Sequence, residues 1–237
     1  LNFALADANG FLDAIEPVAG RLFLTVNVTT LFDAQLTRES LIKALADIQA
    51  RAKPDDVFVF FYAGHGIAMP EGKQTDFYFV LPAVTGMSAP EKVKAGGLSS
   101  AELRDFAAQI PAMKQMLLVD ACNAGAFAEG FALRGAAEEL ALAQLARSSG
   151  AVVITATTDQ QSASEIAALR HGVFTYAIIE GLGGKAAKPD GSITANSLRL
   201  WVDDAVPELS KEYNGSEQFP TTFMFGQDFP LGLWGSN

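Results

Sequence analysis

The sequence contains very little cysteine, histidine and basic charge. Cys122 is the only cysteine, which excludes an internal disulfide and any CxxC metal or redox site. Acidic residues outnumber basic ones by 27 to 17, for a net charge of −10, so the chain lacks the basic stripe that nucleic-acid binding needs. No apolar run reaches the roughly 18 residues of a membrane span, and no signal-peptide pattern opens the chain. These absences predict a soluble, cytoplasmic protein that binds neither nucleic acid nor membrane.

The pattern that is present is typical of a single α/β domain. Hydrophobic residues make up 49% and charged residues 19%, as in ordinary globular proteins. Strand patterns are expected at 22–28, 57–63, 77–84, 116–119, 151–156 and 221–225. Helix patterns are expected at 4–16, 38–52, 100–110, 136–147, 174–182 and from 195 onward, with capping residues Thr37 and Ser99. This alternation of strands and helices predicts a mostly parallel, doubly wound sheet.

Two chemically reactive residues follow predicted strands. His65 comes after the apolar run 57–63, and Cys122 comes after the run that ends at Asp120. Ligands of open α/β sheets bind at the carboxyl ends of the strands, so both side chains are expected at that edge. A cysteine thiolate needs a base within reach, and histidine titrates near neutral pH. The pair predicts a nucleophile, Cys122, and a general base, His65.

The backbone N–H groups of Gly66 and Cys122 are the candidate oxyanion donors for such a pair. Considered singly, each reactive residue has a plainer interpretation. A lone cysteine is most often a small buried residue, and a lone histidine in a turn is most often structural. The occurrence of both at strand ends beside glycine favours catalysis.

The motifs around these residues resemble the caspase and metacaspase superfamily. FYAGHG at 61–66 is followed by DACNAG at 120–125, and the histidine of that superfamily lies about 50 residues before its cysteine. Four further segments resemble bacterial caspase-like domains: ALADA at 4–8, ITATTDQQSASE at 154–165, HGVFTYAIIEGL at 171–182 and GQDFPLG at 226–232. The resemblance implies a caspase-hemoglobinase-like α/β fold of about six strands, with the family's first strand upstream of Leu1.

The resemblance also implies how the chain is divided. One peptidase domain is expected over 1–237, with a large-subunit-like part at 1–125 and a small-subunit-like part at 151–237. The intervening residues 126–150 are a candidate processing linker, with Arg134 and Arg147 as candidate self-cleavage sites.

The activity that the resemblance implies is that of a cysteine endopeptidase acting through a thioester. Asp120, two residues before Cys122, follows the metacaspase pattern D-x-C-x-x-G, which implies an acidic pocket for Arg or Lys before the scissile bond. A carboxylate pairs well with a guanidinium, which favours the same specificity. Asp159 is a second candidate for this pocket. The plainer alternatives are a loop cap for Asp120 and a turn residue for Asp159; His171 is expected to be structural.

Other functions were weighed against the peptidase. A catalytically inactive caspase-like interaction or scaffold module remains an alternative, since a fold can outlast its chemistry. A nucleotide-binding protein is disfavoured because GLGGK at 181–185 follows a predicted helix, not a strand. No cofactor is predicted, and calcium is left open because the acidic residues lack EF-hand spacing. The expected partners are a protein or peptide substrate with a basic residue before the scissile bond, and a regulatory domain or protein, in regulated proteolysis or defence.

Overall fold

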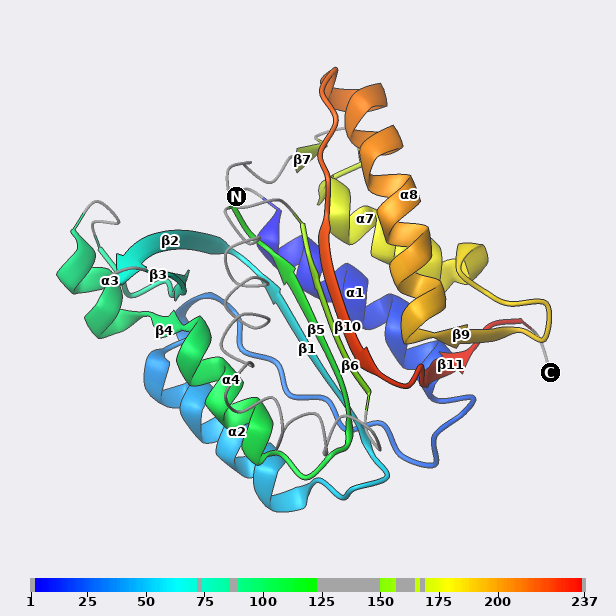
Figure 1. Ribbon diagram of the computed structural model, residues 1–237, viewed down its shortest axis with the longest axis horizontal. Coiled ribbons are helices and arrows are strands. Elements are labelled where there is room, and N and C mark those ends of the chain that lie inside the picture. The colour runs from blue at the N-terminus through cyan, green and yellow to red at the C-terminus, as the bar shows by residue number, and fades with distance from the viewer. Residues whose placement is uncertain are drawn as a thin grey trace.

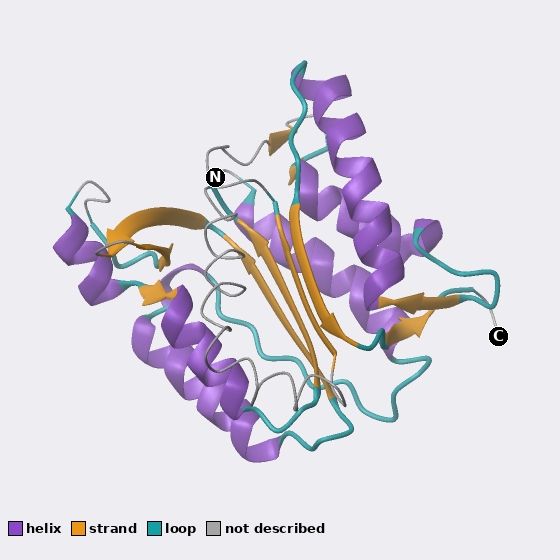
Figure 2. Ribbon diagram, viewed as in Figure 1, coloured by secondary structure: helices purple, strands orange, loops and turns teal. Residues whose placement is uncertain are grey.

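The computed structural model describes residues 3–71, 74–85, 89–122, 150–156, 165–166 and 169–235. Its centre is a four-stranded sheet in the order β1–β5–β6–β10 (Figures 1 and 2). The strands are β1 (Val57–Ala63), β5 (Lys114–Asp120), β6 (Gly150–Thr155) and β10 (Thr221–Gly226). The first three run parallel, and β10 lies antiparallel to β6. The predicted mostly parallel sheet is therefore confirmed.

Helices cover both faces of this sheet (Figure 1). One face carries α1 (Ala4–Ala19), α7 (Val173–Glu180) and α8 (Ala195–Asn214), and the other carries α2 (Arg38–Arg51) and α4 (Ser100–Gln109). Successive side chains of a strand point to opposite faces, so one strand feeds both cores. In β5, Met116 and Leu118 pack toward α1, α7 and α8, whereas Leu117 and Val119 pack toward α2 and α4. All four are fully buried, which gives the doubly wound architecture its two cores.

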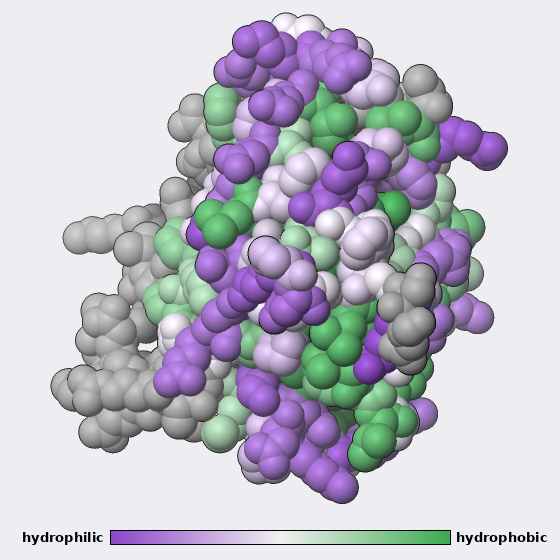
Figure 3. All heavy atoms as spheres, turned by 90° about the vertical axis from the view of Figure 1, so that its right-hand side faces the viewer, coloured by the Kyte–Doolittle hydropathy of each residue, from purple (hydrophilic) through white to green (hydrophobic). Residues whose placement is uncertain are grey.

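The helix starts follow from local sequence. Thr37, Ser99 and Thr194 cap α2, α4 and α8, and each forms a capping box with the residue three positions later. The side chains that α8 buries face the sheet, and Figure 3 shows a largely hydrophilic outer surface on that side of the molecule. Within the described residues, no helix is both long enough and apolar enough to span a membrane.

Short elements complete the described structure. They are η1 (Asp33–Gln35), α3 (Pro90–Gly96), the π-helical turn η2 (Gly181–Lys185), and the strands β2 (His65–Glu71), β3 (Gln74–Val80), β4 (Leu98–Ser99), β7 (Glu165–Ile166), β8 (His171–Gly172), β9 (Ser192–Thr194) and β11 (Pro230–Leu233). Strands β2, β3 and β4 form a separate antiparallel sheet. The turn η2 continues directly from α7, so GLGGK follows a helix as predicted.

The strand predicted at 22–28 is wrong. These residues are not part of any strand, and β1 is an edge strand with β5 as its neighbour. A cavity of about 1490 Å³ lies between residues 22–33, α1, α2 and β1. Alternating apolar residues favour extended backbone, but a strand also needs a pairing partner, and β1 lies across this cavity. For the same reason β1 is only half-buried, not fully buried as its apolar run predicted.

Candidate active site

His65 lies where the chain leaves the central sheet for the β2–β3 hairpin. The side chain is exposed, but the backbone is anchored, because the Tyr62 hydroxyl donates a hydrogen bond to the His65 carbonyl over 2.8 Å. Burial raises the pKa of Tyr62 well above its ordinary value, so its hydroxyl keeps the proton that it donates. The histidine is therefore held at its backbone while its imidazole faces solvent.

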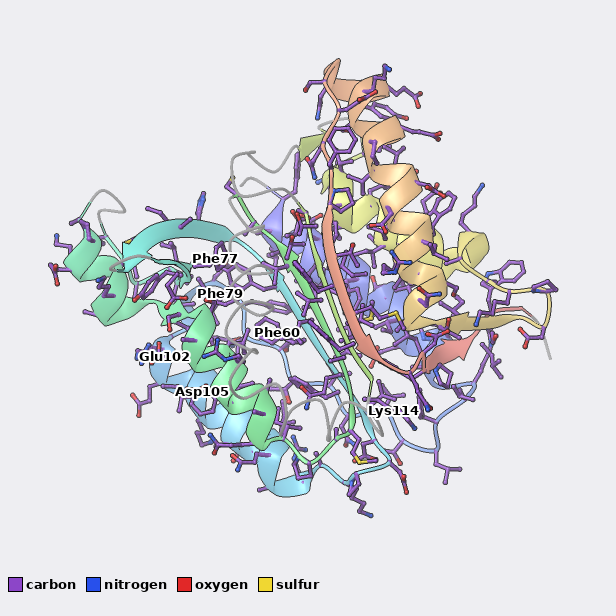
Figure 4. All side chains as sticks on the ribbon, viewed as in Figure 1. Phe60, Phe77, Phe79, Glu102, Asp105 and Lys114 are labelled. Carbon is purple, nitrogen blue, oxygen red and sulfur yellow. The ribbon has the colours of Figure 1, made fainter. Side chains whose placement is uncertain are left out.

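The glycines on either side of His65 are required by packing. A Cβ atom at Gly64 would lie 2.6 Å from the Tyr62 hydroxyl, and one at Gly66 would overlap the Phe77 ring. The Phe77 ring packs edge-on against Phe79 at 5.0 Å, beneath the hairpin (Figure 4). The sequence suggested that these glycines leave room for a substrate; the structure gives a closer reason, which is that the turn must lie flat on two aromatic rings.

Cys122 lies at the same edge, two residues after the end of β5, and is half-buried. Three observations bring it to His65. Ala63 is in register with Asp120, the Gly64 N–H donates to the Asp120 carbonyl over 3.1 Å, and a Cβ at Gly66 would lie 3.0 Å from the Cys122 carbonyl oxygen. The two reactive residues thus follow neighbouring parallel strands at matching positions, as the sequence predicted.

Asp120 is placed beneath the amino end of α7. It is 2% exposed, and its Oδ2 accepts a hydrogen bond from the Thr175 hydroxyl over 2.6 Å. A Cβ at Gly172 would lie 2.7 Å from the same oxygen, so only glycine fits there without displacing the carboxylate. Its role as a pocket acid stays a prediction. Asp159, Arg134 and Arg147 lie outside the described residues.

A second buried carboxylate, Asp7 of α1, was not singled out from the sequence. It is 2% exposed, its Oδ1 accepts the Gly172 N–H over 3.0 Å, and the same oxygen lies 2.9 Å from His171 Nδ1. Asp7 Oδ2 lies 3.4 Å from where a Gly172 Cβ would be, so two carboxylates flank this glycine. The available signal was an acidic residue one turn before the buried Phe11 on the apolar side of the first helix.

His171 completes this cluster. Its Cε1 would lie 2.9 Å from a Cβ at Gly10, so the glycine gives the imidazole a niche on α1. Burial, together with the charge of Arg170, lowers the pKa of His171 below its ordinary value. The neutral ring can donate its Nδ1 proton to Asp7, and the cluster ties α1 to the start of α7.

No group of three or more histidine, cysteine, aspartate or glutamate side chains suited to a metal ion occurs in the described part of the chain. The chemistry that this part offers is therefore that of the half-buried thiol and the exposed imidazole at one sheet edge.

A doubly wound sheet with a cysteine and a histidine at adjacent strand ends defines a class of protein, the α/β cysteine hydrolases. A search with family models then identifies the family. The model described as the caspase domain matches residues 6–224, and the chain belongs to this family of cysteine peptidases.

Solved structures share the fold. Protein GSU0716 from Geobacter sulfurreducens superposes with a TM-score of 0.62 at 20% identity, covering 96% of this chain and 85% of the other. Caspase-1 from Spodoptera frugiperda superposes with a TM-score of 0.50 at 15% identity, covering 92% and 77%. Curated proteins gave no match.

Proposed function

We propose that this protein is a cysteine endopeptidase in which Cys122 is the nucleophile and His65 the general base. The observation that carries the proposal is the register of β1 and β5, which places both residues just beyond paired strand ends, with the Cys122 carbonyl against Gly66. A histidine anchored at its backbone and exposed at its ring can reach both a thiol and a leaving amine.

The reaction follows from these two groups. His65 accepts the Cys122 thiol proton, and the thiolate sulfur attacks the scissile carbonyl carbon to form a tetrahedral oxyanion. The C–N bond breaks as His65 returns the proton to the leaving amine, which leaves a thioester on Cys122. Water, deprotonated by His65, then hydrolyses the thioester and restores the thiol.

The proposed oxyanion donors are the backbone N–H groups of Gly66 and Cys122. The contact between Gly66 and the Cys122 carbonyl supports this, because it brings the two backbone segments together. Removing one such donor typically slows acyl transfer by about 10²–10³-fold.

The proposed specificity is for Arg or Lys before the scissile bond, with Asp120 as the pocket acid and Asp159 as a second. The structure adds a supporting observation, because Asp7 and Asp120 put two buried carboxylates around Gly172, close to Cys122 in the sequence and the sheet. Two carboxylates sharing one small region favour a cationic ligand.

The proposed biological role is regulated proteolysis or defence signalling, under the control of a regulatory domain or protein. The proposal includes division into 1–125 and 151–237 by cleavage after Arg134 or Arg147. Such cleavage would appear as a Cys122-dependent pair of bands on a denaturing gel.

The proposal predicts turnover of fluorogenic peptides that end in Arg or Lys, and none of matched peptides that end in Asp. Cys122→Ala should abolish turnover, and His65→Ala should lower kcat by about 10²-fold or more because proton transfer is lost. Initial rates are measured with the three peptide series, each with EDTA and with calcium.

Two results would contradict the proposal. Preference for Asp would remove the acidic pocket, and turnover that survives Cys122→Ala would remove the nucleophile. A folded wild-type protein with no turnover of any series in either buffer would favour the scaffold alternative.

A further inference from the structure

The hydroxyl of Thr175 is held against the proposed pocket acid. Thr175 is fully buried in the first turn of α7, and its Oγ1 lies 2.6 Å from Asp120 Oδ2. A hydroxyl that donates to a carboxylate makes a short, charge-assisted hydrogen bond. The geometry fits that bond, with Asp120 as the acceptor.

The position of this hydroxyl is fixed from the other side of α7. Gly172, the residue before the helix, donates its N–H to Asp7, and the adjacent His171 ring bonds to the same carboxylate oxygen. Helix α7 therefore cannot shift along the sheet without breaking two contacts to α1. Thr175 presents its hydroxyl from a helix that is held in place.

Asp120 itself is fixed at its backbone. Its carbonyl accepts the N–H of Gly64, the residue before His65, over 3.1 Å. Rotation of its side chain is limited on one side by Gly172, whose Cα lies against Oδ2. The bond from Thr175 selects the remaining orientation and leaves further lone pairs of the carboxylate for a ligand.

We infer that Thr175 is a specificity-determining positioning residue: its hydroxyl holds Asp120 oriented and ionised to receive the basic side chain of a substrate. This inference rests on the proposed function. A hydrogen bond to the charged form of a carboxylate favours that form, whereas a buried carboxylate without its donor takes up a proton more readily. Asp120 is 2% exposed without substrate, so the incoming cation has to displace part of its cover and meets a carboxylate already set in place.

The first test compares Thr175→Val with wild type, on peptides that end in Arg and on matched peptides that end in Ala. Valine keeps the shape of threonine and removes the donor. KM for the Arg peptide should rise about 10- to 100-fold, the equivalent of a lost bond to a charged group, and KM for the Ala peptide should change less than about threefold. Thr175→Ser, which restores a hydroxyl, should recover most of the Arg preference.

The matched control is Thr222→Val. Thr222 on β10 also donates its hydroxyl to an aspartate, Asp203 of α8, over 2.9 Å. This variant loses the same kind of bond away from the site, so its preference for Arg over Ala should equal that of wild type. Thermal unfolding of all variants separates a change in specificity from a loss of folding.

A second test asks whether Thr175 acts only through Asp120. In a double-mutant cycle, Thr175→Val added to Asp120→Asn should change the Arg preference no further. Thr175→Val alone should also move the acidic limb of kcat/KM for the Arg peptide to higher pH, because the carboxylate protonates more easily. Asp7 and His171, the described titratable neighbours across Gly172, are unaltered in this comparison. Thr175→Cys, a weaker donor of similar size, takes the place of valine if that variant does not fold.

The outcomes separate the inference from the proposed function. A folded Thr175→Val enzyme with the wild-type Arg preference and pH profile overturns the inference and leaves the peptidase intact. Equal losses in Thr175→Val and Thr222→Val also overturn it. A wild-type enzyme without any preference for Arg contradicts the basic specificity of the proposed function itself, and the inference falls with it. Binding of an Arg-terminated peptide amide to Cys122→Ala, measured by calorimetry, gives the same comparison without turnover.

Discussion

Tyr62 and the two glycines around His65 decide where the imidazole can lie. The Tyr62 ring underlies Gly64, its hydroxyl binds the His65 carbonyl, and its edge packs on Phe79 at 4.9 Å. A general base must stay within hydrogen-bond distance of its nucleophile, so an anchored backbone serves the proposed chemistry directly.

Tyr62→Phe should slow the reaction of Cys122 with iodoacetamide at pH 7 by about 2- to 10-fold, because the turn that carries His65 loses a bond worth about 0.5–1.5 kcal/mol. The rate is measured by intact-mass spectrometry over time. Tyr213→Phe, at an exposed position on α8, is the control and should react as wild type does. An unchanged rate in Tyr62→Phe, with only its stability lowered, would show that the tyrosine does not position the base.

Single residues were predictable where their type is rare. One cysteine and two histidines leave few assignments, and both proposed catalytic residues stand beside glycine after apolar runs. Asp7 and Thr175 gave no comparable signal, because their partners lie 165 and 55 residues away in the chain. Such pairings depend on how α1 and α7 dock on the sheet, which a sequence pattern does not encode.

At the scale of elements, α2 and α4 are joined by one ion pair. Arg38 of α2 bonds to the Glu102 carboxylate and to the Gly97 carbonyl, and Glu102 also accepts the Ser99 N–H in the capping box of α4 (Figure 4 labels Glu102). Burial disfavours the charge of Glu102, but the bonds from Arg38 and Ser99 outweigh it, so the pKa of Glu102 is lowered.

Glu102→Gln should reduce the free energy of unfolding by at most about 1 kcal/mol at neutral pH, since the pair is partly exposed and screened. Glutamine still satisfies the capping box, so the change isolates the charge. A lowered pKa stabilises the fold above the unfolded-state value, near 4.3, and that stabilisation is lost as the pH falls through the folded-state pKa. Urea unfolding from pH 7 to pH 3 should show the gap between wild type and variant closing on the acidic side. A gap independent of pH would contradict the lowered pKa, and Glu208→Gln on α8 serves as the exposed control.

Elements were predictable where local chemistry decides them. The caps at Thr37, Ser99 and Thr194 and the buried strands β5 and β6 follow from side-chain bonding and apolar runs. The extended segment at 22–28 failed as a strand because pairing is a property of two segments, and the cavity separates it from β1. The β2 strand was missed because it is defined by its pairing with β3, through the register His65 with Val80.

For the whole molecule, the alternation of strand and helix patterns correctly predicted a doubly wound sheet with two cores. The direction of β10 was not predictable, because an apolar strand pattern reads the same in either direction, and only the pairing with β6 shows it to be antiparallel. The sheet places the ends of β1 and β5 together, so the proposed dyad is a consequence of the fold and not of a local motif.

The central claim is that Cys122, assisted by His65, attacks a substrate that carries a basic residue. The most direct measurement is peptide mapping by mass spectrometry after incubation with Arg-terminated and Asp-terminated peptidyl chloromethyl ketones. The account predicts one adduct, on Cys122, from the Arg-terminated reagent, formed about 10²-fold more slowly in His65→Ala. Absence of that adduct from Cys122, or equally fast labelling by the Asp-terminated reagent, would contradict it.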